Sequence, residues 1–89
     1  MGKYSLRIKD PAAKEIERIE PKKVRRQIVT RIQGLATDPR PPGCEKLAGA
    51  GERYRVRQGA YRIVYEVRDL ELVVVLVKVG HRSQVYKNL

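Results

Sequence analysis

The sequence has little cysteine, little acidic charge and no long hydrophobic run. Cys44 has no second thiol with which to form an intramolecular disulfide, which favours a reducing compartment such as the bacterial cytoplasm. The longest uninterrupted apolar run, Leu72 to Val77, is far shorter than the ~20 residues that a bilayer requires. No signal peptide is evident, so we predict a cytoplasmic protein that does not interact with membranes.

The scarcity of acidic residues leaves a strong positive charge. Ten Asp and Glu stand against twenty Lys and Arg, a net charge of +10 on 89 residues, and arginine is the commoner of the two cations. Such a field attracts polyanions, and the arginine fork donates two hydrogen bonds to a phosphate. Nucleic acid is therefore the favoured partner, with an acidic protein partner or simple solubility as the alternatives.

The N-terminal third predicts a strand followed by a helix. Tyr4, Leu6 and Ile8 alternate with polar residues, as in a strand with one buried face. Asp10 is predicted as the N-cap of the helix, with Pro11 in its first helical position.

Two helices are expected before the middle of the chain. Ala12, Ile16 and Ile19 form a narrow apolar stripe, and Pro21 then opens a longer helix that reaches Leu35. Because almost no linker separates them, we predict an antiparallel helical hairpin packed on one face of a sheet.

The second half of the chain reads as β-structure. A proline-rich loop covers residues 37–43, and the ambiguous stretch 45–51 could hold a short strand around Lys46-Leu47. Three strands are then expected, at residues 53–57, 61–68 and 70–79. The order β-α-α-β-β-β predicts an α+β fold, with a small and mainly antiparallel sheet and no βαβ crossover.

The hairpin between the first two of these strands carries a local conflict. Gly59 at the first turn position suits a two-residue type II′ turn. This register places Arg57 directly opposite Arg62, with both side chains on one face. Two like charges in that position are unfavourable unless an anion lies between them. The conflict therefore indicates a face that meets phosphate.

The last strand is apolar on both faces, which predicts a central position in the sheet. A turn at Asp69-Leu70 would set Arg68 opposite Glu71. The face away from the helices is then expected to be an apolar floor with a cationic rim. Its expected residues are Val64, Val73, Val75, Val77 and Val79, with Arg55, Arg57 and Arg62.

A polar segment, Gly80 to Tyr86, follows this strand. It contains the only histidine of the chain, His81, together with Arg82 and Tyr86. A buried strand that delivers such side chains to its own end is a platform for a site. We therefore predict a composite site made from this segment and the hairpin arginines.

Two segments carry a family resemblance: Tyr54–Arg57 continued by Gly59–Tyr65, and Val79–Tyr86. Through them the chain resembles the RelE branch of the RelE/ParE toxin superfamily of bacterial and archaeal toxin–antitoxin pairs. The resemblance covers nearly the whole chain and implies one RelE-like toxin domain over residues 1–89. It further implies a ribosome-dependent endoribonuclease that cleaves mRNA in the A site without a metal or cofactor. The implied partners are mRNA on the ribosome, with contacts to 16S rRNA, and a cognate antitoxin.

The resemblance also implies the site residues. The basic positions of the family correspond to Arg55, Arg57, Arg62 and Arg82, and its C-terminal tyrosine corresponds to Tyr86. The Escherichia coli type of RelE has lysine where this chain has Arg55 and Arg57. Arginine keeps its proton, so these two positions retain phosphate binding and charge stabilisation but are poor candidates for a general base.

Cleavage of RNA by its own 2′-hydroxyl needs a base, positive charge at the phosphate and an acid for the leaving oxygen. No His, Cys, Asp and Glu residues are grouped at metal-ligand spacing, which agrees with a reaction of this kind. We expect the hairpin arginines to clamp the phosphate and Arg82 to assist the leaving oxygen. Tyr86 would stack on a base or transfer a proton, and His81 would supplement the base.

Two other functions remain open at this point. A ParE-like toxin shares the fold but inhibits DNA gyrase and cuts no RNA. The presence of Arg62, Arg82 and Tyr86 together argues against it. A catalytically silent RNA-binding or structural domain is the third possibility.

Overall fold

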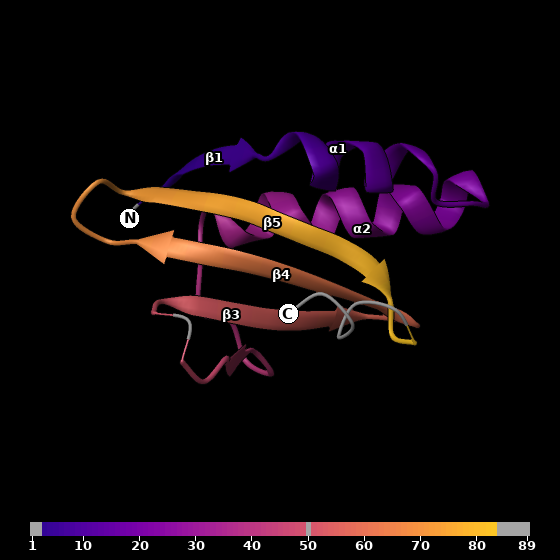
Figure 1. Cartoon of the computed structure of the whole chain (residues 1–89). Coiled ribbons are helices and arrows are strands. Elements are labelled where there is room, and N and C mark those ends of the chain that lie inside the picture. The colour runs from indigo at the N-terminus through magenta and orange to yellow at the C-terminus, as the bar shows by residue number, and fades with distance from the viewer. Residues whose placement is uncertain (1–2, 50, 84–89) are drawn as a thin grey trace.

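A computed structural model describes residues 3–49 and 51–83 of the chain. The elements are β1 (Ser5–Ile8), α1 (Asp10–Glu17), α2 (Lys22–Leu35), β2 (Glu45–Lys46), β3 (Arg53–Gln58), β4 (Tyr61–Arg68) and β5 (Val73–His81). Both helices lie on one face of the sheet (Figure 1). The α+β class and the helical hairpin are confirmed, and the short strand β2 is one residue earlier than the sequence indicated.

The five strands form one mixed sheet in the order β1-β5-β4-β3-β2. Three neighbouring pairs are antiparallel, as expected, whereas β1 pairs with β5 in parallel, from Ser5 opposite Val73 to Ile8 opposite Leu76. β5 therefore has a neighbour on each side, which explains why its residues are apolar on both faces.

The start of α1 differs by one residue from the prediction. Lys9 is the N-cap, and its carbonyl accepts the first helical hydrogen bond from the Ala13 amide at 3.0 Å. Asp10 lies inside the first turn, where its carboxylate still complements the partial positive charge of the exposed amides. The second helix begins at Lys22 with Pro21 as its N-cap, and because α1 already ends at Glu17, residues 18–21 separate the two helices, a longer connection than the sequence indicated.

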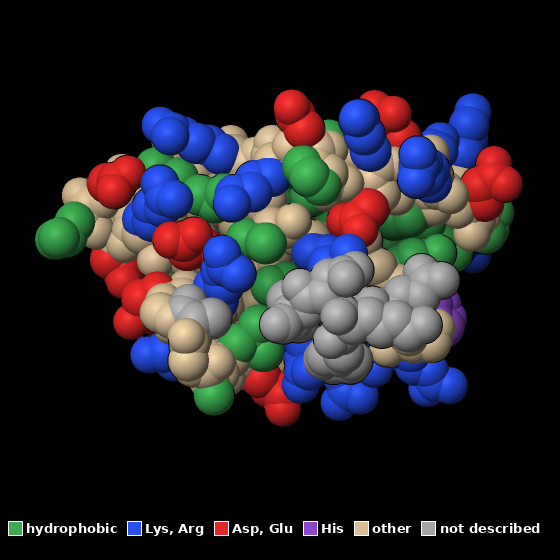
Figure 2. Space-filling model, in the orientation of Figure 1, with side chains coloured by type: hydrophobic (Ala, Val, Ile, Leu, Met, Phe, Trp, Pro, Cys, Tyr) green, Lys and Arg blue, Asp and Glu red, His purple; other side chains and the backbone are tan. Residues whose placement is uncertain are grey.

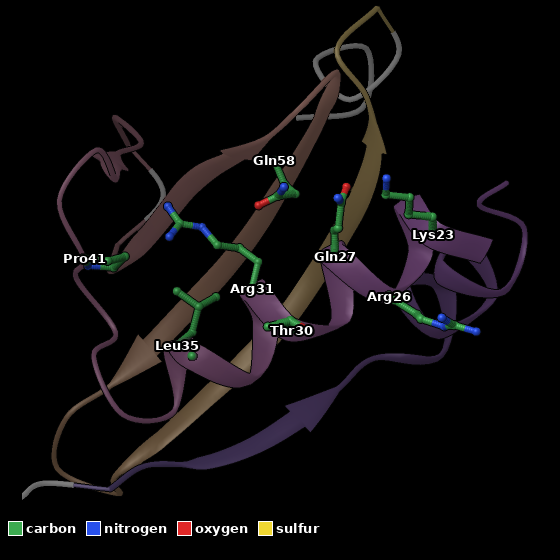
Figure 3. Close-up of a pocket in the computed structure, with 9 residues that line it drawn as sticks. Lys23, Arg26, Gln27, Thr30, Arg31, Leu35, Pro41 and Gln58 are labelled. Atoms are coloured by element: carbon green, nitrogen blue, oxygen red, sulfur yellow. The ribbon is translucent and has the colours of Figure 1, made fainter. Parts of the chain in front are cut away.

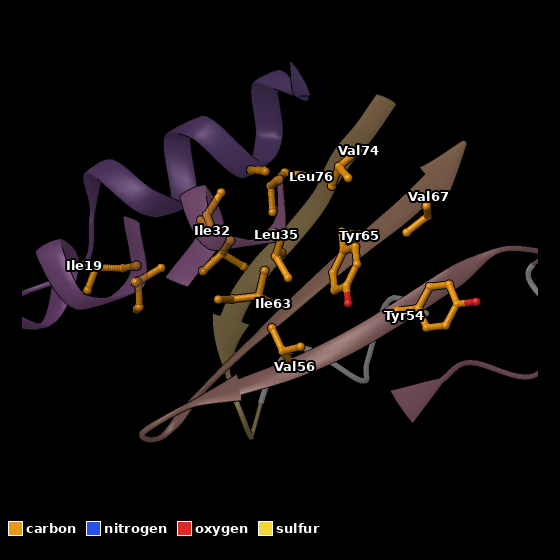
Figure 4. Close-up of a cluster of buried hydrophobic side chains, with 13 residues drawn as sticks. Ile19, Ile32, Leu35, Tyr54, Val56, Ile63, Tyr65, Val67, Val74 and Leu76 are labelled. Carbon is orange, nitrogen blue, oxygen red and sulfur yellow. The ribbon is translucent and has the colours of Figure 1, made fainter. Parts of the chain in front are cut away.

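The core lies between the helices and the sheet (Figure 4). Ile32 and Leu35 of α2 pack toward Ile63 and Tyr65 of β4, and all four side chains are almost completely buried. The Tyr65 hydroxyl donates a hydrogen bond of 2.7 Å to the Pro39 carbonyl. Burial raises the pKa of that hydroxyl. This contact ties the proline-rich loop to the centre of the sheet.

The turn between β4 and β5 is longer than predicted. Arg68 lies opposite Val73, not Glu71, and residues 69–72 form the connection. The Glu71 amide donates to the Arg68 carbonyl and the Leu72 amide to the Asp69 carbonyl, so these groups are satisfied within the turn. Leu70 is fully exposed there, although its apolar side chain made it look like part of the strand.

A polar cluster holds this turn against the loop before β2. The Arg40 guanidinium donates to both carboxylate oxygens of Asp69, at 3.1 and 2.7 Å, and lies 5.1 Å from the centre of the Tyr54 ring. The Tyr4 hydroxyl donates to Asp69 at 2.7 Å. The hydrogen bonds from Arg40 and Tyr4 lower the pKa of Asp69 to about 2.

A bulge in β5 changes which of its side chains face the helices. Val64 lies opposite Lys78 but Tyr65 lies opposite Leu76, which leaves Val77 unmatched. Val79 therefore joins the core on the helix side, so the prediction that it belongs to the open face was wrong. Because the bulge adds one residue, it reverses the alternation that the sequence suggested for the rest of the strand.

β1 ends at Ile8, opposite Leu76, so among residues 3–49 and 51–83 the outer edge of β5 has no strand partner beyond that point. There the Glu15 carboxylate of α1 accepts a hydrogen bond of 2.9 Å from the Val79 amide. Its other oxygen accepts one of 2.8 Å from the Lys78 ammonium group. A helix side chain thus satisfies one backbone amide of the strand edge that β1 leaves uncovered.

Candidate nucleic-acid interface

The hairpin register brings Arg55, Arg57 and Arg62 to the side of the sheet that faces away from the helices. Arg57 lies directly opposite Arg62, as predicted, and Gly59 has a φ of 61° at the first turn position. The neighbouring residues of both strands, including Val56 and Ile63, point into the core on the helix side. We call Arg55, Arg57 and Arg62 the arginine face. Lys and Arg side chains lie along the molecular edge that follows β3 and the hairpin (Figure 2).

Arg55 forms an ion pair with Glu45, its cross-strand neighbour on β2. The Arg55 side chain is 20% exposed and that of Glu45 is 59% exposed. The hydrogen bond and charge of Arg55 lower the pKa of the Glu45 carboxyl, and the charges of Arg57 and Arg62 lower it further. The positive potential of the whole arginine face therefore acts on this carboxylate.

The other two arginines differ in how firmly they are held. Arg62 donates through Nη1 to the carbonyls of Gly59 and Tyr61, at 3.3 and 3.2 Å, so its guanidinium is folded against the turn. Arg57 is exposed and makes no hydrogen bond or ion pair with the described residues. Its donors are open to a ligand.

Arg82 lies close to the hairpin turn. Its amide donates a hydrogen bond of 2.8 Å to the Ala60 carbonyl, and its side chain is exposed. The turn and the end of β5 lie together at one end of the sheet (Figure 1). The structure thus gathers the four arginines of the predicted site at or near one end of the sheet. Tyr86 lies outside the described residues.

His81 belongs to β5 itself, so the strand extends further than the sequence suggested. It lies opposite Tyr61, and the two rings meet edge to face with their centres 5.8 Å apart. Tyr61 packs against the helix-side core, so His81 is on the other face of the sheet from the arginines. The imidazole Nδ1 accepts a hydrogen bond of 3.2 Å from the Ser83 amide, which puts the proton of the neutral ring on Nε2.

The hollow beside His81 has a volume of about 280 Å³, and Glu15, Arg18 and Lys78 contribute to its lining. This hollow lies between α1 and the end of β5. His81 and the arginine face are thus two separate surfaces that share one end of the molecule.

A larger groove of about 640 Å³ runs along α2 (Figure 3). Its cationic lining residues are Lys23, Arg26 and Arg31, and Leu35 and Pro41 add apolar surface. Arg31 extends from α2 toward β3, and its Nε is buried without a hydrogen-bond partner among the described residues. This groove was not predicted from the sequence, although cations and small residues recur on α2 at intervals of three and four.

Within residues 3–49 and 51–83, no three His, Cys, Asp or Glu side chains come together as a potential metal site. No helix in the same residues is long and apolar enough to cross a membrane.

Comparison with known proteins adds the family. Residues 6–86 match the model of the ParE toxin of the type II toxin-antitoxin system, parDE. The chain is 30% identical over 88 residues to a putative RelE-like toxin protein of Escherichia coli, covering 94% of this chain and 90% of that protein. It is 23% identical to the toxin RelG of Mycobacterium tuberculosis, covering 94% of this chain and 97% of that toxin.

Solved structures agree with this assignment. The RelE–RelB complex of Pyrococcus horikoshii matches with a TM-score of 0.80 and 27% identity, over 93% of this chain and 99% of that one. The intact RelBE toxin-antitoxin complex of E. coli matches with a TM-score of 0.76 and 30% identity, over 88% and 95%. The chain therefore belongs to the RelE/ParE superfamily of type II toxins, and within it is a toxin of the RelE type.

Proposed function

We propose that this toxin is an endoribonuclease that cleaves mRNA in the ribosomal A site and so inhibits translation. The observation that carries the proposal is Arg57 opposite Arg62 on one exposed face, with Arg55 two residues away. In the free protein this arrangement concentrates like charge. A phosphodiester bound between the guanidinium groups would turn that cost into attraction. We also propose that residues 1–89 form one toxin domain and that the protein acts in the cytoplasm.

The chemistry follows from the arginines that are present. Arg57 and Arg62 would hold the scissile phosphate, and Arg55 would add charge to the developing dianion. Arg82, at the adjacent turn, would stabilise the leaving oxygen. Because arginine keeps its proton, these residues stabilise charge and do not act as the base. The 2′-hydroxyl of the RNA is the nucleophile, so the reaction as proposed needs no metal.

We propose that Tyr86 takes part in proton transfer. His81 is proposed to supplement it only after a change of conformation, because its ring lies on the face of the sheet opposite the arginine face and the Ser83 amide occupies its Nδ1. Tyr86 is proposed to stack on a base or to transfer a proton, as its match to the family suggests.

The test is primer extension on mRNA translated by purified ribosomes. We expect Arg62→Ala and Arg82→Ala each to reduce codon cleavage about 10²-fold or more, the usual loss when one group that stabilises transition-state charge is removed. Arg7→Ala is the matched control, because Arg7 is exposed on β1, outside the arginine face. Unchanged cleavage in both site variants would contradict the proposal. A DNA gyrase supercoiling assay on the same samples tests the ParE-like activity.

The partners proposed are mRNA on the ribosome, with contacts to 16S rRNA, and a cognate antitoxin. Related structures are complexes of RelE with RelB, which supports the antitoxin. We propose that an acidic or amphipathic segment of the antitoxin covers the arginine face. If so, the double variant Arg57→Ala and Arg62→Ala should bind the co-expressed antitoxin more weakly than wild type. Equal affinity measured by calorimetry would remove this assignment.

A further inference from the structure

We propose that single-stranded RNA leaves the arginine face over the edge of β3 and continues into the groove along α2, which holds the nucleotides next to the cleaved phosphate. This inference rests on the proposed function, because it extends the substrate beyond the phosphate that the arginines bind. The occupant of the groove is thus RNA, not a segment of a partner protein.

The two surfaces meet at the end of β3. Arg57 belongs to the arginine face, whereas Gln58 lies opposite Tyr61 on the helix side, where it lines the groove. β2 pairs only with Tyr54 and Arg55, so no strand within the described residues covers the outer edge of β3 at residues 57 and 58. A nucleic-acid strand that crosses this bare edge contacts Arg57 and then Gln58.

The groove carries positive charge along one row of α2. Lys23, Gln27 and Arg31 follow one another at intervals of four residues, which places them on one side of the helix. Figure 3 shows Arg31 reaching from this row toward β3, which contributes Gln58 to the opposite wall. None of the described residues that line the groove is acidic. The groove is therefore complementary in charge to an RNA backbone.

The row is long enough for more than one nucleotide. From Lys23 to Arg31 the helix rises about 12 Å, and stacked nucleotides of one strand advance by about 3.4 Å each, so roughly three fit along it. The side-chain amides of Gln27 and Gln58 offer donors and acceptors to the edges of unpaired bases. Continuity with the arginine face favours RNA over an acidic peptide, because the substrate already lies at the end of the groove.

Gly34 gives an independent indication that the groove receives a ligand. It lies in the last turn of α2 and lines the groove, and a Cβ at this position would meet no atom within 4 Å beyond its own helix backbone and chain neighbours. Packing within the protein therefore does not require glycine here, although glycine is less favourable in a helix than any residue but proline. The missing side chain leaves this wall open to the close approach of a ligand backbone.

The experiment measures binding of 2′-O-methyl RNA, which cannot be cleaved, by fluorescence anisotropy. The probes are a nonamer and a trinucleotide, which the arginine face alone can hold. Lys23→Gln should weaken binding of the nonamer about two- to fivefold, the range for one exposed ionic contact. Lys22→Gln is the matched control, because it removes the same charge from the neighbouring exposed position, which does not line the groove. The two variants should bind the trinucleotide equally.

The salt dependence gives a second readout. For the nonamer, the slope of log K against log salt concentration should be smaller by about 0.7 in Lys23→Gln than in Lys22→Gln, as expected for the loss of one phosphate contact to a single strand.

Gly34→Leu tests the groove without a change of charge. Its side chain would fill the open wall, so binding of the nonamer should fall at least as much as in Lys23→Gln. The Tm should not fall, because leucine favours a helix more than glycine does. Weaker binding by a protein that is no less stable separates a blocked groove from a damaged fold.

Three results would each overturn the inference: equal losses for the nonamer and the trinucleotide, equal losses in Lys22→Gln and Lys23→Gln, or wild-type binding of the nonamer by Gly34→Leu. If the groove variants bind the nonamer as wild type does but bind the co-expressed antitoxin more weakly, the groove belongs to a protein partner and the inference is wrong. If wild type cuts no mRNA on ribosomes while the losses specific to the nonamer persist, the proposed nuclease function fails and the RNA groove stands.

Discussion

The like-charge pair in the hairpin predicts that a substitution can stabilise the protein while it damages the site. Arg57→Gln removes one of two positive charges that lie directly opposite each other on β3 and β4. Cross-strand charge pairs change stability by about 0.2–1 kcal/mol. Arg57 is exposed, and its attraction to Glu45 is lost as well, so we expect a gain of about 0.5 kcal/mol in the free energy of unfolding.

The assay is urea denaturation followed by far-ultraviolet circular dichroism, with thermal melting alongside. For a domain of this length, a gain of that size raises Tm by about 2–4 °C at low salt. The gain should vanish near 1 M salt, where the Debye length is only about 3 Å. Codon cleavage by the same variant should fall, because the phosphate loses a guanidinium partner.

Arg7→Gln separates the cross-strand effect from the overall charge of +10. Arg7 is exposed on β1, and its strand partner is Val75, so this variant removes one positive charge without relieving a like-charge pair. If Arg57→Gln were no more stable than Arg7→Gln at low salt, the reasoning about strain at the arginine face would be refuted.

Other parts of the fold give further predictions. Tyr65→Phe removes the hydroxyl that donates to the Pro39 carbonyl, and urea denaturation should show a loss of about 1 kcal/mol. The pKa of Asp69 falls from 3.8 to about 2 on folding, so the stability from this carboxylate is complete above about pH 4 and is lost as the pH falls toward 2. Asp69→Asn should remove this loss of unfolding free energy as the pH falls toward 2. Leu70→Lys, at a fully exposed turn position, should change the unfolding free energy by less than about 0.5 kcal/mol.

The hairpin was predictable from sequence because its determinants are local. A glycine at the first turn position and strict alternation on both sides fix the register, and Arg57 opposite Arg62 follows from it. The helices were predictable for the same reason, since Pro21 and the apolar spacing act within a few residues.

The features that the sequence did not predict depend on contacts between distant segments. The parallel pairing of β1 with β5 joins the two ends of the fold. No residue in the sequence signals the bulge at Val77, because a run of valines is compatible with either register. The ion pair of Glu45 with Arg55 was not predicted because it depends on which strand lies beside β3, and a two-residue strand has almost no sequence pattern.

The contact between Glu15 and β5 has a consequence for self-association. An uncovered strand edge offers its amides to any other extended chain, and sheets grow by such additions. The Val79 amide is already bonded to a carboxylate, and Lys78 beside it carries a charge that a further strand would have to accommodate. A single helix residue therefore occupies one of the amides that an added strand would need on the stretch of edge beyond β1.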